Sequence, residues 1–130
     1  MSQAVNPAGW PRPSGYANGM LADGFLAISG QIGWNERGEL VSDDFLAQAA
    51  QALRNVAAVL TAAGGAPEHL VRLTWYVVDK NEYRTALRGL GGIYREIFGE
   101  HYPAMALVQV ADLLEEGARV EIEASAVLPR

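Results

Sequence analysis

One stretch of the sequence decides the fold: His101-Tyr-Pro-Ala-Met-Ala-Leu-Val-Gln-Val-Ala-Asp-Leu-Leu-Glu-Glu-Gly-Ala-Arg-Val-Glu-Ile-Glu-Ala-Ser-Ala-Val-Leu128. It contains two strand-like runs, Ala104–Val110 and Arg119–Leu128, with a polar turn at Leu114–Gly117 between them. The second run alternates, so one face is apolar and the other is polar. The apolar face comprises Val120, Ile122, Ala124 and Ala126, and the polar face comprises Glu121, Glu123 and Ser125. A carboxylate in the middle of a strand lies either on a solvated face or in a functional site.

Upstream of this stretch, the sequence predicts an arm, a hairpin and a helix. Residues 1–15 are rich in proline and glycine, which predicts an irregular N-terminal arm before one domain over residues 16–130. Asp23-Gly24 lies between two apolar runs and predicts a hairpin turn. A helix is expected to begin near Ser42, whose hydroxyl suits an N-cap, and to end at the glycine pair that starts with Gly64.

A strand and a second helix complete the pattern. Val71–Asp79 is rich in β-branched and aromatic residues, as strands are. The second helix is expected over Asn81–Gly99, with a break or kink in its glycine-containing middle, at Gly89, Gly91 and Gly92. The order of elements predicts an α+β fold in which two helices cover one face of a single mixed sheet.

Composition limits the function classes. The chain has 130 residues, enough for one domain with its own core, and no cysteine for a disulfide, a thiol nucleophile or a metal. Its two histidines, His69 and His101, have no metal-site spacing. A net charge of −5 disfavours nucleic acid as a partner. No signal-peptide pattern and no apolar run of roughly 20 residues is present, so we expect a cytoplasmic protein without membrane contact.

The quoted stretch resembles the C-terminal signature of a known family. Tyr102-Pro-Ala followed by Val108-x-Val-Ala-x-Leu and then by Val120-Glu-Ile-Glu-Ala is similar to the text of the Rid family, the reactive intermediate deaminases, also called the YjgF family. The resemblance extends from Tyr16 to Leu128. It implies a chorismate-mutase-like fold in which three chains pack their sheets into a central barrel, with a ligand cleft at each subunit interface. It also brings an older ribonuclease label, which the acidic charge disfavours.

The resemblance implies a site assembled from two chains. The positions that match the family's site are Tyr16, Ser29, Gly30, Tyr76, Met105 and Glu121. In the family, an arginine at the position of Met105 pairs with a substrate carboxylate, and the glutamate at the position of Glu121 holds or activates a water that attacks an imine carbon. Glu123 shares a strand face with Glu121, and two carboxylates so placed raise one another's pKa modestly.

Met105 is the departure that matters most. A thioether neither pairs with a carboxylate nor donates a hydrogen bond, so the family's acid-binding group is absent. Three explanations stay open: a larger or more apolar imine or enamine, a chain that has lost catalysis, or another chemistry. Arg12 in the arm and Arg119, on the face of Glu121 if the strand is regular, are the candidate replacement cations.

The sequence therefore predicts a cofactor-free, metal-free homotrimer that hydrolyses a small reactive imine or enamine and releases ammonia. Glu121 is its expected catalytic residue. The alternative is a non-catalytic small-molecule-binding or scaffold trimer of the same family. A cleft filled by Met105, Trp10 or Tyr76 would favour that alternative.

Overall fold

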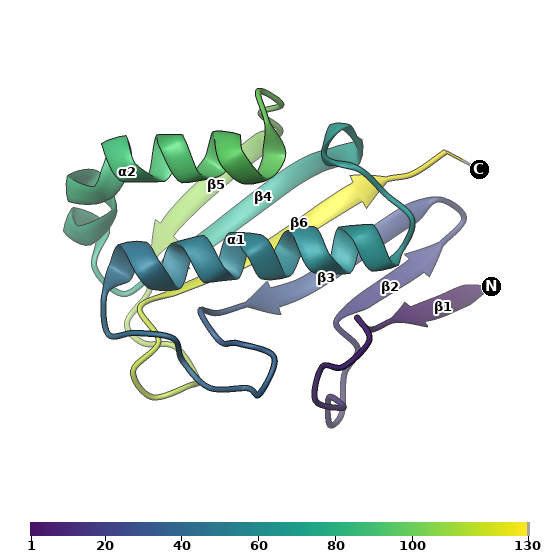
Figure 1. The fold of residues 1–130 in the computed structure, drawn as a ribbon, viewed down its shortest axis with the longest axis horizontal. Helices are drawn as coiled ribbons and strands as arrows, with labels where there is room; N and C mark the ends of the chain where they lie inside the picture. Colours follow the sequence, from purple (N-terminus) through teal and green to yellow (C-terminus); the bar gives the residue numbers. More distant parts are fainter. Residues whose placement is uncertain (130) are drawn as a thin grey trace.

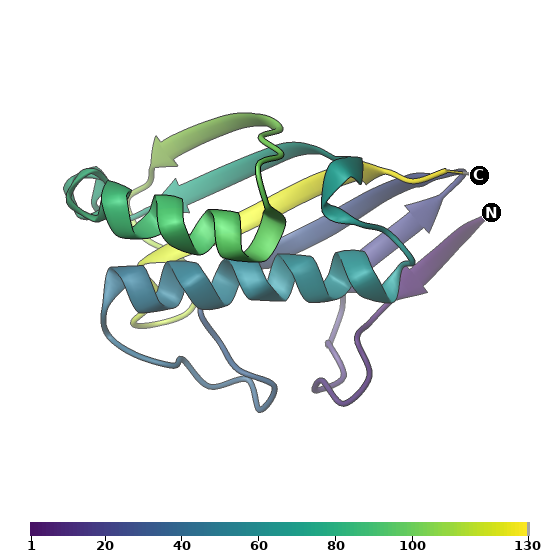
Figure 2. The ribbon, with the colours of Figure 1, turned by 45° about the horizontal axis from the view of Figure 1, so that its top comes forward.

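In the computed structural model, a six-stranded sheet carries two helices on one face (Figures 1 and 2). The structure describes residues 1–129, and Arg130, the last residue of the expected domain, lies outside them. The strands lie in the order β1-β2-β3-β6-β4-β5. Only β4 and β5 pair in parallel, and the other neighbours are antiparallel, so the sheet is mixed as predicted. The strands are β1 (Ser2–Val5), β2 (Gly19–Ala22), β3 (Phe25–Gln31), β4 (Leu70–Val77), β5 (Ala104–Gln109) and β6 (Val120–Val127).

The arm contains a strand that the sequence analysis did not predict. β1 pairs antiparallel with β2, so the expectation that residues 1–15 are irregular is wrong for residues 2–5. Proline and glycine dominate only residues 7–15, and β1 precedes them. After β1, the Asn6 carboxamide oxygen accepts hydrogen bonds from the backbone and side chain of Asn18, at 2.9 and 3.1 Å. Trp10 packs on the core of its own chain.

The hairpin and the first helix agree with the sequence prediction. Asp23 and Gly24, which join β2 to β3, both have positive φ, as a two-residue hairpin turn requires. α1 (Phe45–Ala62) begins two residues later than expected, because its N-cap is Asp44, whose carboxylate accepts from the Ala47 amide at 3.0 Å. Small residues let α1 lie close to the sheet.

The second helix is continuous. α2 (Lys80–Phe98) runs without interruption through its glycines, so the expected break is wrong. Gly89 lies where α2 meets α1, and a Cβ there would be 2.9 Å from Leu46 Cδ2. The glycine therefore serves helix packing. A short 3₁₀ helix, η1 (Pro67–His69), precedes β4. Within residues 1–129, no helix is both long and apolar enough to cross a membrane.

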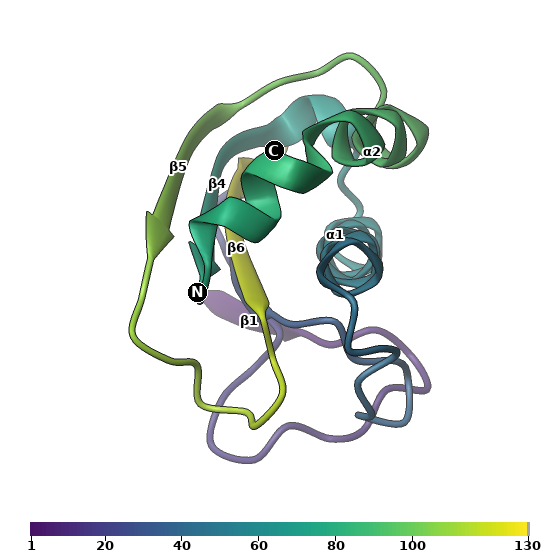
Figure 3. The same ribbon diagram turned by 90° about the vertical axis from the view of Figure 1, so that its left-hand side faces the viewer.

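The two faces of the sheet differ. The core lies between the sheet and the helices, and within residues 1–129 no helix covers the opposite face, called the open face below (Figure 3). Val120, Ile122, Ala124 and Ala126, the residues of β6 that face the helices, are 0–5% exposed, and Trp75 of β4 contacts Tyr83 of α2 edge to face. The open face contains apolar or small side chains from β5 and β6, which are Ala104, Ala106, Val108, Ser125 and Val127.

Candidate active site at one end of the open face

Glu121 lies on the open face of β6. It is paired in register with Tyr76 of β4, whereas its neighbours Val120 and Ile122 point into the core. Burial raises the pKa of Glu121 above its ordinary value, and the nearby Glu123 carboxylate raises it further. No hydrogen-bond partner for the Glu121 carboxylate occurs among residues 1–129. A half-buried carboxylate without a partner is free to accept a proton.

A glycine makes room for this carboxylate. The register between β3 and β6 shifts between Ile28 and Gln31, and Gly30 lies in that irregular segment. A Cβ built on Gly30 would be 2.7 Å from Glu121 Cδ and 2.9 Å from Cγ, closer than side chains tolerate. Gly30 therefore lets the Glu121 side chain lie directly against the backbone of β3.

Ser29 holds the neighbouring segment of the arm. Its hydroxyl donates to the Ala17 carbonyl at 2.5 Å, and its amide donates to the Asn18 carbonyl at 2.8 Å. Both of its donors are thus engaged within the chain, and only its hydroxyl oxygen can accept a bond from a ligand. This pairing holds the segment that follows Tyr16 beside Gly30 and Glu121.

A cavity of about 320 Å³ joins four of the predicted site residues, Tyr16, Ser29, Gly30 and Glu121. Four lining residues were not predicted: Ile32, Trp34, Leu114 and Glu115. Leu114 and Glu115 come from the turn between β5 and β6, which the sequence identified only as a turn. The available signal in the sequence was a leucine in an otherwise polar turn, and in the structure this Leu114 is fully exposed.

Tyr76 lies on the same face but outside this cavity. Its hydroxyl donates to Glu123 Oε1 at 2.5 Å, and this bond raises the pKa of Tyr76. Trp75 faces the helices and Tyr76 the open face, because successive residues of a strand point to opposite faces of the sheet. Tyr76 therefore orients Glu123, which in turn influences Glu121.

Met105 does not line the cavity at Glu121 in a single chain. It pairs in register with the buried Leu73 and so shares the helix-covered face of the sheet. It lines a separate cavity of about 280 Å³ between α2 and β5, with Trp75 and Tyr94 among its walls. Met105 and Glu121 thus lie on opposite faces of the sheet.

The two candidate cations differ in their environment. Arg119 precedes β6, and its guanidinium bonds Glu82 at 2.9 Å and the Asp43 carbonyl at 2.7 Å, near the starts of α2 and α1. The expectation that it shares a strand face with Glu121 is wrong because the strand begins only at Val120. Arg12 is exposed and has no hydrogen-bond or ion-pair partner among residues 1–129.

Comparison with known proteins gives a consistent assignment. The family model described as "Endoribonuclease L-PSP" matches residues 10–128. This chain belongs to the Rid, or YjgF, family. A Homo sapiens 2-iminobutanoate/2-iminopropanoate deaminase is 39% identical over 113 residues, covering 86% of this chain and 79% of that protein. A Salmonella typhimurium protein of the same name is 34% identical over 131 residues and covers 98% of both.

The solved structures of the Rid family match the fold as well. The crystal structure of the YjgF gene product from E. coli superposes with a TM-score of 0.82 at 35% identity, covering 96% of this chain and 98% of that one. The six-stranded mixed sheet and its two helices are therefore the architecture of the family. Within residues 1–129 of this Rid-family chain, no three His, Asp or Glu side chains are grouped so as to hold a metal.

Proposed function

We propose that this chain hydrolyses a reactive imine or enamine without a cofactor and releases ammonia. In this reaction water adds to the imine carbon, the C–N bond breaks, and a ketone or aldehyde and ammonia form. Glu121 takes a proton from the water and returns it to the departing nitrogen. The observation that carries the proposal is the half-buried Glu121 carboxylate, which lies unpaired against Gly30 in an open cavity. Relatives at 34–39% identity that are named imine deaminases support it.

The active assembly in this proposal is a homotrimer with ligand sites between subunits. Phe25, Val108 and Val127 are 44–52% exposed, and another copy packed on the open face would cover apolar surface of this kind. Such packing is also the way for a neighbour's Met105 to approach Glu121, since the two lie on opposite faces of one chain. Tyr16, Ser29, Gly30 and Tyr76 then shape or support the cleft.

Met105 makes the substrate atypical. A charge-assisted hydrogen bond contributes about 1.5–3 kcal/mol, and a bidentate arginine pair more. A chain with Met105 at the arginine position is therefore expected to bind small 2-imino acids at least tens of times less well. The substrate is accordingly larger or more apolar, or its acid group binds elsewhere.

The test measures the loss of imines that an amino-acid oxidase generates in place. We expect Glu121→Gln to lower the rate about 10²–10⁴-fold while the fold is retained. Met105→Arg is expected to gain activity on small 2-imino acids, and that gain should require Glu121. If neither the native chain nor Met105→Arg hydrolyses any imine faster than it decays spontaneously, the deaminase proposal fails.

The alternative of a non-catalytic scaffold makes a different prediction about the cavity. A scaffold would fill the cleft, and the obvious candidates were Trp10, Tyr76 and Met105. None of these lines the cavity at Glu121 in the chain described. In the proposed trimer the cleft lies between subunits, where a neighbour's Met105 approaches Glu121, so the imine assay decides between the two.

A further inference from the structure

The cavity at Glu121 is lined by acidic and aromatic side chains and by no basic one. Glu115 and Glu121 contribute carboxylates, and Tyr16 and Trp34 contribute rings. The other walls are uncharged, and no lysine or arginine of residues 1–129 lines the cavity. The net charge of the whole chain is −5, so no excess of basic residues elsewhere compensates the two carboxylates. The cavity therefore attracts a cationic ligand and repels an anionic one.

Glu121 itself lacks a counter-ion. Its carboxylate is half-buried, and the charged group that influences it is Glu123, another acid, which accepts a hydrogen bond from Tyr76. No lysine or arginine among residues 1–129 forms an ion pair with it. A cationic ligand supplies the opposite charge, which offsets the cost of burying the carboxylate. The carboxylate of a 2-imino acid is bonded to the imine carbon, so it would place a like charge beside Glu121 whenever that carbon reacts there.

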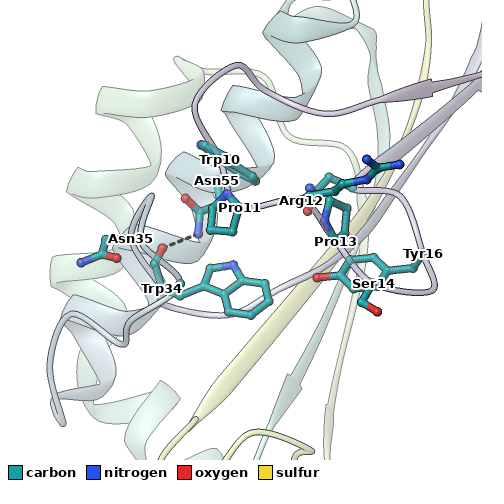
Figure 4. A pocket seen from close by; sticks show the side chains of 11 residues that line it. Trp10, Pro11, Arg12, Pro13, Ser14, Tyr16, Trp34, Asn35 and Asn55 are labelled. Carbon is teal, nitrogen blue, oxygen red and sulfur yellow. Dashed lines mark hydrogen bonds between the residues drawn. The ribbon is translucent and has the colours of Figure 1, made fainter.

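The Trp34 ring is held in position at this cavity. Its indole donates to the Gln31 carboxamide at 3.4 Å, and its carbonyl accepts from the Asn55 amide at 2.9 Å (Figure 4). The Arg12 guanidinium extends away from the Trp34 ring in Figure 4 and does not line the cavity at Glu121. The faces of aromatic rings attract cations. A ring fixed beside two carboxylates therefore adds to the preference for a cationic ligand.

The surroundings of Met105 carry no charge either. Met105 is 48% exposed, and the cavity of about 280 Å³ that it lines has only apolar, aromatic and glycine walls. Arg95 lies beside Gly91 of α2 but does not line this cavity. In the proposed trimer a neighbour's Met105 approaches Glu121. The part of a substrate that extends from the imine carbon toward that neighbour therefore meets apolar surface.

We propose that the substrate is a protonated imine with an apolar substituent and no carboxylate. This inference rests on the proposed imine hydrolysis at Glu121 and on the trimer proposed with it. The cationic C=N group lies beside Glu115 and Glu121, and the apolar substituent lies against a neighbour's Met105.

The same arrangement serves the chemical step. Water adds to the imine carbon as Glu121 takes its proton, Glu121 then returns that proton to the nitrogen, and the C–N bond breaks. The protonated imine and water thus give a neutral ketone or aldehyde and an ammonium ion. Glu115 is a binding residue in this step, because a nearby opposite charge keeps the imine in its protonated, more electrophilic form.

The first test compares ligands of one shape and different charge on the native chain. Benzamidine, benzamide and benzoate share a ring and a planar end group that is cationic, neutral and anionic, and the amidinium of benzamidine stands in for the protonated imine. We expect calorimetry to show benzamidine binding at least about tenfold more tightly than benzamide or benzoate. Acetamidine, which lacks the ring, should bind at least about tenfold more weakly than benzamidine. Benzoate binding as tightly as benzamidine would overturn the proposal, and equal affinity for acetamidine and benzamidine would contradict its apolar substituent.

The second test separates the cavity from the overall charge of the chain. Glu115→Gln should weaken benzamidine about two- to fivefold, because exposed ion pairs contribute little, and leave benzamide unchanged. Glu116→Gln is the matched control: it removes the same charge from the same turn, but Glu116 does not line the cavity. It should leave both affinities unchanged. If the two variants weaken benzamidine equally, the net charge and not the cavity attracts the cation, and the proposal is wrong.

The third test measures hydrolysis. The imine of benzylamine, generated in place by an amine oxidase that releases it, is compared with the imine of alanine from an amino-acid oxidase. We expect the native chain to hydrolyse the benzylamine imine with a kcat/KM at least about tenfold higher. If the alanine imine is hydrolysed equally fast, the substrate proposal is wrong while the deaminase function stands. If neither imine is hydrolysed but benzamidine binding depends on Glu115, the deaminase function is wrong while the cation-binding cavity stands.

Discussion

The two faces of strand β6 differ in what surrounds their side chains. On one face Val120 and Ile122 are fully buried beneath the helices. On the other, Glu121 is half-buried without a hydrogen-bond partner in residues 1–129, and Glu123 is bonded to Tyr76. The first face gains free energy by excluding water from apolar groups, whereas the second keeps a desolvated carboxylate, which costs free energy. The alternation of side chains along β6 therefore places the residues that stabilise the fold on one face and the proposed catalytic residue on the other.

The largest effect is expected on the buried face. Ile122→Ala removes a fully buried side chain beneath the helices and should lower the free energy of unfolding by about 2–5 kcal/mol. Ser125→Ala, on the open face of the same strand, should change it by no more than about 0.5 kcal/mol. Urea denaturation measures both. Equal destabilisation by the two variants would show that the two faces of β6 contribute alike to stability, against the difference described here.

A smaller effect, on activity, is expected where the Glu121 side chain contacts Gly30 of β3. Gly30→Ala places a Cβ 2.7 Å from Glu121 Cδ, so the carboxylate must move. A displacement of this size is expected to lower kcat/KM about tenfold or more while the chain stays folded. The matched control is Gly92→Ala in α2, where the added methyl group would meet none of the described residues outside the adjoining helix backbone within 4 Å. It should keep full activity and gain about 0.4–1 kcal/mol of stability; full activity in Gly30→Ala would contradict the assigned role of Glu121.

Much of the fold follows from periodicity in the sequence. Alternation in β6 placed its buried and open residues correctly, and Asp23-Gly24 identified the hairpin. β1 was missed because its four residues depend on pairing with β2, a tertiary contact that local pattern does not encode. The break in α2 was wrong for a related reason: helix propensity counts the cost of Gly89, but packing against Leu46 outweighs it.

The site was predicted less completely than the fold. Glu121, Gly30, Ser29 and Tyr16 line one cavity, whereas Tyr76 and Met105, the other two predicted site residues, lie outside it. Trp34 and Leu114 were missed because loops bring them there, and loop conformation depends on contacts distant in sequence. The prediction that Arg119 shares a strand face with Glu121 was also wrong. The strand begins one residue later than expected, at Val120, and Arg119 bonds Glu82 instead.

The smallest expected effect concerns Glu123 and pH. The proposed base must be deprotonated, and its pKa is raised first by burial and then by Glu123, so the acid limb of kcat/KM should lie above the ordinary glutamate range. The raised pKa also means that the folded chain favours protonated Glu121. The contribution of Glu121 to the free energy of unfolding is therefore fully present below its ordinary pKa and is lost as the pH rises through the raised pKa. Glu123→Gln removes the neighbouring charge while its amide oxygen can still accept from Tyr76. The acid limb should then move to lower pH without reaching the ordinary range, because burial, the larger cause, remains. If the acid limb of kcat/KM stays at the same pH in Glu123→Gln, the Glu123 charge does not affect the pKa of Glu121.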